Sequence, residues 1–179
     1  MGASLSSIAV KQKSPEMVRE AFGLRPTGKH GTFRSAKFSG AMLPSGWYLV
    51  CLNRHEFSDA QMRQLSSGDG EVVACFVEEH VMVSKAAGWK DGRELWAVTY
   101  ESELVKNPFV LDVRGTPPPQ FARIRDELFA KQTPDTCDYI FDIPVSLAAD
   151  IVGFRYDERS EVDFEVLEKP SFFSRMFGR

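Results

Sequence analysis

The fold is expected to form around residues 71–101, which read EVVACFVEEHVMVSKAAGWKDGRELWAVTYE. Residues 72–77 and 95–100 are rich in β-branched and aromatic side chains, as is the short run 81–83, and such runs are typical of strands. Asp91-Gly92 separates the last two runs, and Asp-Gly in this position predicts a two-residue hairpin loop. The stretch therefore predicts an antiparallel sheet.

The predicted hairpin also fixes which residues face one another. With Asp91-Gly92 as the loop, Gly88 would face Leu95 and Ala87 would face Trp96. Small residues on one strand would then leave room for large residues on the next.

Strand and helix patterns continue on both sides of this stretch. Strands are predicted at 8–12, 32–38, 47–52, 109–113, 139–143 and 163–167, and helices at 15–22, 58–65, 119–131 and 144–152. Residues 25–31, rich in Gly, Pro and basic residues, are expected to form a loop. Hairpins mixed with strand-helix-strand units favour an α+β fold: a central antiparallel or mixed sheet with three to four helices packed on it. Residues 1–169 would form a single domain, followed by an apolar tail at 170–179.

Composition limits the classes of protein to consider. The chain has 179 residues, of which 43% are hydrophobic and 26% charged, so one domain with a sizeable core is expected. The net charge of −3 argues against nonspecific nucleic-acid binding, although it leaves room for a local basic patch. Cys51, Cys75 and Cys137 are widely spaced, which favours unpaired thiols in the reducing cytoplasm. No apolar run approaches the roughly 20 residues that span a bilayer, so integral membrane association is not expected.

Motifs for catalysis and cofactor binding are weak. Residues 23–30, GLRPTGKH, come nearest to a phosphate-binding loop, but His30 replaces the required Ser or Thr and the segment follows a helix. A basic loop containing Arg25, Lys29, His30 and Arg34 that touches an acidic partner is the better interpretation. The histidines are isolated, and neither HExxH nor GxSxG occurs, so we expect no catalytic residues, no metal and no cofactor.

Candidate binding residues lie in three places. Trp89, next to the hairpin turn, would either be exposed as a binding hot spot or fold back over the hairpin. Glu78 and Glu79 would complement a basic partner. In the tail, one face of a short helix would carry Phe172, Phe173, Met176 and Phe177. So short a helix must dock on its own domain, on a partner groove or on a membrane surface.

These observations favour a non-catalytic module that binds another protein, with a basic protein as one form of partner. Small bacterial immunity proteins that neutralise toxins have this general character. One alternative is a hydrolase-type enzyme whose site is assembled from distant residues, with His80 and Glu78, or Asp138 and Asp142, as first candidates. Another is a structural subunit of a homo-oligomer whose tail docks on a neighbouring copy.

Overall fold

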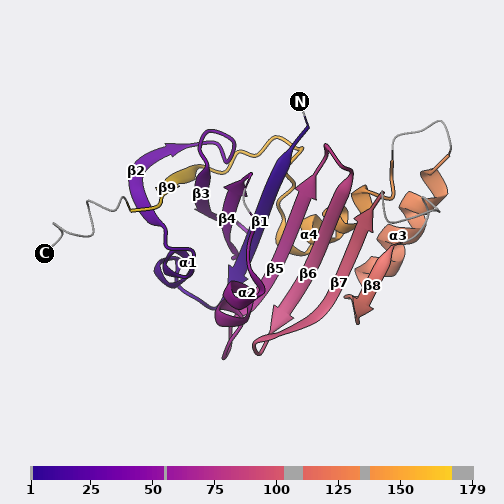
Figure 1. The fold of residues 1–179 in the computed structure, drawn as a ribbon, viewed down its shortest axis with the longest axis horizontal. Coiled ribbons are helices and arrows are strands. Elements are labelled where there is room, and N and C mark those ends of the chain that lie inside the picture. The colour runs from indigo at the N-terminus through magenta and orange to yellow at the C-terminus, as the bar shows by residue number, and fades with distance from the viewer. Residues whose placement is uncertain (1, 55, 103–110, 134–137, 171–179) are drawn as a thin grey trace, which may run out of the picture.

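The computed structural model describes residues 2–54, 56–102, 111–133 and 138–170. Nine strands lie within these ranges: β1 (Ser4–Lys11), β2 (Arg25–Gly31), β3 (Phe38–Met42), β4 (Tyr48–Asn53), β5 (Glu71–Glu78), β6 (Val83–Lys90), β7 (Arg93–Glu101), β8 (Asp112–Gly115) and β9 (Phe164–Glu168). All of them join one sheet in the order β2-β9-β3-β4-β1-β5-β6-β7-β8, and every neighbouring pair is antiparallel (Figure 1). The fold is therefore α+β, but the sheet extends through the whole described fold and is larger than a central sheet.

Four helices accompany the sheet in the described part of the chain: α1 (Pro15–Ala21), α2 (Asp59–Leu65), α3 (Gln120–Lys131) and α4 (Asp142–Val152). Three of their ends follow the predicted local signals. Ser14 accepts a hydrogen bond from the Met17 amide at the start of α1, and Ser58 and Gln61 form a capping box on α2. Gly153 ends α4 with a left-handed φ of 81°.

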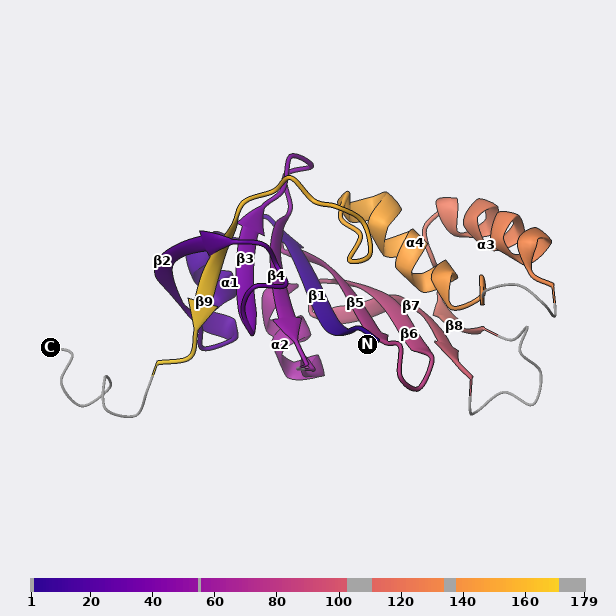
Figure 2. The ribbon, with the colours of Figure 1, turned by 90° about the horizontal axis from the view of Figure 1, so that it is seen from above.

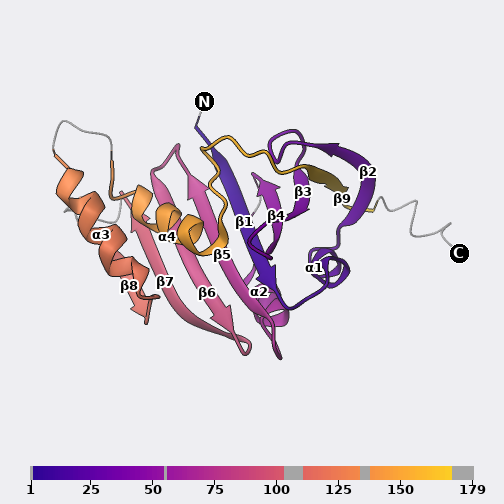
Figure 3. The same ribbon diagram turned by 180° about the vertical axis from the view of Figure 1, so that it is seen from behind.

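The helices lie on opposite faces of the sheet. Figure 3 shows α4 crossing β5, β6 and β7, with α3 packed beside it, whereas α1 and α2 lie on the other face. Figure 2 shows the two helix pairs on either side of the strands. Each face has a core cluster of its own, which includes Trp47 and Trp96 on the α4 face and Trp89 and Met62 on the α2 face.

The β6–β7 hairpin at Asp91-Gly92 is confirmed, but part of its predicted register is wrong. Gly88 faces Trp96 rather than Leu95, because a β-bulge between Gly88 and Trp89 adds Leu95 as an extra residue. The bulge turns Trp96 onto the α4 face, where Gly88 leaves room for its ring. Of the apolar run predicted at 81–83, only Val83 belongs to a strand, because β6 begins there.

The prediction of a loop at 25–31 and a strand at 32–38 is wrong. Residues 25–31 form the edge strand β2, which pairs with β9 and is irregular between Pro26 and His30. An edge strand tolerates Pro because its outward N–H needs no partner strand. The chain then turns, and the Ser35 amide donates to the Thr32 carbonyl at 3.0 Å.

The predicted strand at 139–143 is also wrong, because α4 already begins at Asp142. Asp138 Oδ1 accepts hydrogen bonds from the amides of Ile140 and Phe141, at 3.1 and 3.3 Å, and this closes a turn. Ile140, Phe141 and Ile143 are all buried, so the apparent alternation reflects a buried turn rather than a half-buried strand.

The remaining expectations concern the tail, the thiols and the membrane. The tail beyond Pro170 lies outside the described residues, as does Cys137, and the division into one domain plus tail stays a prediction. Cys51 and Cys75 are free and buried, and burial raises the pKa of Cys75 to about 12. No helix in the described ranges is long and apolar enough to cross a membrane.

Candidate functional site

A groove of about 590 Å³ opens at the end of the sheet where β1 begins and β4 ends. One wall is the turn 33–37, and another is Tyr156, which belongs to the segment 153–163 between α4 and β9. Asn53 and Arg54 lie between these walls. We call this feature the basic groove.

Asn53, the last residue of β4, holds the turn in place. Its side-chain amide donates hydrogen bonds to the carbonyls of Phe33, at 2.8 Å, and Ala36, at 2.6 Å. Its backbone amide donates to the Lys37 carbonyl at 2.9 Å. Three hydrogen bonds from one residue therefore fix the wall that carries Arg34 and Lys37.

The groove is positively charged. Arg34, Lys37 and Arg54 line it, and none of its lining residues is a carboxylate. Arg34 Nη2 donates to the Tyr156 carbonyl at 2.5 Å, and its guanidinium lies 5.2 Å from the centre of the Phe33 ring. Because these contacts use a neutral carbonyl and a ring, they orient the Arg34 side chain without cancelling its charge.

Arg54 has an unusual backbone conformation, with a φ of 55°. Residues other than Gly rarely adopt this left-handed region, and such residues cluster at functional sites. The Arg54 amide donates to the Ser4 carbonyl at 3.0 Å, which ties the end of β4 to the start of β1. The sheet thus holds Arg54 at the groove.

Glu79 does not line the groove itself, but it bonds to two residues that do, Tyr156 and Ala3. The Tyr156 hydroxyl donates to Glu79 Oε1 at 2.7 Å, and the Ala3 amide donates to Glu79 Oε2 at 2.7 Å. Burial and the hydrogen bond to Glu79 both raise the pKa of Tyr156 above its ordinary value. Glu79, which was predicted as a binding residue, therefore has both carboxylate oxygens engaged within the protein.

Glu78 pairs with His80 in the loop after β5. Glu78 Oε1 lies 2.7 Å from His80 Nδ1. Hydrogen bonding to Ser4, and secondarily to His80, lowers the pKa of Glu78. This contact brings together one of the two predicted catalytic pairs, at an exposed loop.

Asp138 and Asp142, the other predicted catalytic pair, do not share a strand. Asp138 closes the turn described above and accepts a hydrogen bond from the Tyr100 hydroxyl. Asp142 lies at the start of α4, 3.2 Å from Arg155 Nη2. In the described part of the chain, no group of three or more acidic, His or Cys residues could hold a metal ion.

Trp89 is only 3% exposed, so the structure has it folded back rather than exposed. Its ring packs in the core on the α2 face, because Trp89 and Met62 belong to the same cluster. The four predicted tail residues, Phe172, Phe173, Met176 and Phe177, lie outside the described residues.

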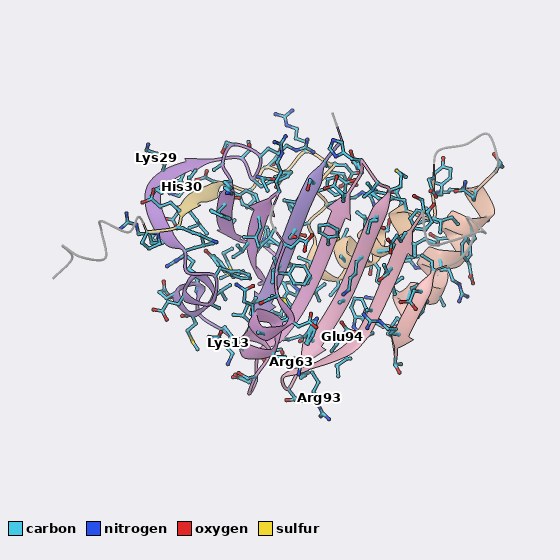
Figure 4. All side chains as sticks on the ribbon, viewed as in Figure 1. Lys13, Lys29, His30, Arg63, Arg93 and Glu94 are labelled. Atoms are coloured by element: carbon cyan, nitrogen blue, oxygen red, sulfur yellow. The ribbon has the colours of Figure 1, made fainter. Side chains whose placement is uncertain are left out.

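The predicted basic loop is divided by the fold. Arg25 pairs with Glu168 at 2.8 Å and His30 with Asp163 at 2.8 Å, both between β2 and the β9 region. Figure 4 shows Lys29 and His30 together on β2. Of the four loop residues, only Arg34 lines the groove.

Sequence reasoning did not single out Lys37, Asn53 and Arg54. The turn at 43–46 between β3 and β4 could have pointed to these residues. An antiparallel hairpin around this turn brings residues 37 and 53 close together. The chain matches no known family model, and comparisons with curated proteins and with solved structures gave no match.

Proposed function

We propose that this protein is a non-catalytic module that binds another protein, and that an acidic segment of that partner enters the basic groove. The observation that carries the proposal is the charge of the groove: three cations line it and no carboxylate does, in a chain whose net charge is −3. A local concentration of positive charge in a concave site attracts and orients acidic ligands.

The geometry of the groove favours a peptide-like ligand. At about 590 Å³ the groove is open and has room for several side chains. Arg34 presents a guanidinium group, and such groups bind carboxylates through two parallel hydrogen bonds. Lys37 adds a compact charge on a flexible stem, which accommodates variation in the ligand.

This proposal changes the expected chemistry of the partner. Glu78 and Glu79, the residues predicted to meet a basic partner, are both already engaged in contacts within the protein. An acidic partner meets the cations of the groove directly. A cytoplasmic immunity protein that neutralises a toxin would act in this way if the toxin presents an acidic segment.

The first test uses a defined probe. A fluorescent Glu-rich peptide is titrated with the full chain, and its anisotropy is measured at low and high salt. We expect saturable binding that weakens with salt, because the interaction is ionic. Lys37→Glu should weaken binding about tenfold or more, since a charge reversal replaces attraction with repulsion.

Lys29→Glu is the matched control, because Lys29 is an exposed lysine on β2 outside the groove. The same variants, and a chain ending at Lys169, are then used to capture proteins from native lysate, read by mass spectrometry. Equal peptide binding by Lys37→Glu and the unmodified chain would refute the proposal. A partner lost on truncation but retained by Lys37→Glu would move the interface to the tail.

A further inference from the structure

A second basic site lies at the opposite end of the sheet from the basic groove. A cleft of about 290 Å³ opens where α2 meets the β6–β7 hairpin. Figure 4 shows Arg63, Arg93 and Glu94 at this end of the sheet. We call this feature the hairpin cleft. Its charged lining consists of four cations, Arg63, Lys85, Arg93 and Arg114, and two carboxylates, Asp59 and Glu94.

Ion pairing leaves part of this positive charge unneutralised. Glu94 lies 3.3 Å from Arg114 Nη2 and 4.0 Å from Lys85 Nζ, so this carboxylate is shared between two cations. Arg63 and Arg93 form no ion pair with any residue that the structure describes. Asp59 lies one turn before Arg63 on α2, yet the two side chains do not come within ion-pair distance. Two guanidinium groups are therefore available at one cleft.

The two walls of the cleft are fastened to each other. The Gly92 amide, at the tip of the hairpin, donates to the Ser66 carbonyl at 3.1 Å. Ser66 caps the end of α2, and its hydroxyl donates to the Met62 carbonyl at 2.7 Å. The helix that carries Arg63 and the hairpin that carries Arg93 are thus joined, which reduces the ordering needed when a ligand binds.

The lining also contains a buried donor. Trp89 lines the cleft and is 3% exposed, and its indole Nε1 is covered and has no hydrogen-bond partner among the described residues. The indole N–H of Trp89 can therefore serve as a spectroscopic reporter in a residue that lines the cleft.

We propose that the hairpin cleft binds a phosphate group, as inorganic phosphate or as a small phosphate monoester, between Arg63 and Arg93. Guanidinium groups match the geometry and charge of phosphate oxygens, and two of them suit a dianion. The small volume fits a compact anion better than a peptide. This site is separate from the basic groove, so the inference does not depend on the proposed function.

Nuclear magnetic resonance tests the site directly. The full chain is titrated with inorganic phosphate, and separately with glycerol phosphate, at ionic strength held constant with chloride. The indole N–H signal of Trp89 should shift saturably. The signal of Trp47 should not move, because Trp47 belongs to the core on the other face.

Variants decide whether the two arginines are responsible. Arg63→Gln and Arg93→Gln should each weaken phosphate binding about tenfold or more. Lys29→Gln, which also removes one exposed cation, should leave it unchanged. Tighter binding of glycerol phosphate would identify a monoester as the ligand, and equal or weaker binding would identify free phosphate. The proposal would be overturned by an absent or non-saturable Trp89 shift. It would also be overturned if both arginine variants bound phosphate as tightly as the unmodified chain does.

Discussion

Gly88→Ala should destabilise the protein, because Gly88 lies under the ring of Trp96. A Cβ atom at Gly88 would be 2.2 Å from Trp96 Nε1 and 2.4 Å from Cε2. Favourable contacts between such atoms begin at about 3.5 Å, so either the ring or the strand must move by more than an ångström. Trp96 is 7% exposed within the core on the α4 face, which leaves its ring little space to move into.

The expected cost follows from two opposing effects. Overpacking a well-packed core costs about 1–3 kcal/mol. Replacing Gly by Ala restricts the unfolded chain, which offsets roughly 0.4–1 kcal/mol of that cost. Gly88→Ala should therefore lower the free energy of unfolding by about 1–2 kcal/mol. Urea denaturation measures this loss as a lower midpoint with an unchanged slope.

A double-mutant cycle tests the assigned cause. Trp96→Leu alone should cost roughly 2–4 kcal/mol, because it leaves a cavity in the core. In the Gly88→Ala/Trp96→Leu variant the added methyl group has space. The double variant should therefore lose about 1–2 kcal/mol less stability than the sum of the two single variants. Additive losses, or a Gly88→Ala variant as stable as the original chain, would refute the contact between Gly88 and Trp96 as the reason for glycine here.

Two further predictions concern α4 and the basic groove. Burial raises the pKa of Asp142 above its ordinary value of 3.8, although Arg155 acts in the opposite direction. The protonated form of Asp142 therefore stabilises the folded protein. This stabilisation is complete below pH 3.8 and is lost as the pH rises through the raised pKa. The urea midpoint of the unmodified chain should fall between pH 3.8 and neutral pH, and Asp142→Asn should make this fall smaller. If the variant showed the same dependence of the midpoint on pH, the assignment to Asp142 would be wrong. Asn53→Ala removes the hydrogen bonds to the Phe33 and Ala36 carbonyls and should cost about 1–3 kcal/mol in urea denaturation. It should also weaken binding of the Glu-rich peptide, and unchanged binding would show that the turn keeps its position without Asn53.

Local turn and capping chemistry made part of the fold predictable. Asp91-Gly92, Ser58 with Gln61, and Gly153 each act through hydrogen bonds or φ values within a few residues, so the sequence carries the signal directly. The bulge that places Trp96 opposite Gly88 has no such signal. It depends on which face of the sheet has room for an indole ring, and that is decided by α4, far away in the sequence.

The wrong assignments share a different cause. The Gly and Pro residues of 25–31 predict a loop, but at the edge of a sheet the missing N–H of Pro26 costs little, and β9 supplies a partner from the far end of the chain. Alternation at 139–143 predicts a strand, but Ile140 is buried along with Phe141 and Ile143, and α4 already begins at Asp142. In both cases tertiary contacts outweighed the local pattern.

The two proposed sites show why net charge alone could not locate them. Ion pairing, rather than composition, decides where charge remains at a surface. Arg155 lies within ion-pair distance of Asp142 and Asp157, and Glu79 is held by the Tyr156 hydroxyl and the Ala3 amide. Carboxylates used in this way inside the fold no longer compensate the cations at its two ends.

An overall charge of −3 is therefore compatible with two concave sites of the opposite sign. This predicts a characteristic salt response. Ligands that enter these sites should bind with an affinity that falls as the salt concentration rises, as for a basic protein. The whole chain should show little affinity for nonspecific nucleic acid, because the net negative charge dominates the electrostatic potential far from the protein. If a charged ligand bound with no salt dependence at either site, these cations would not be the groups that hold it.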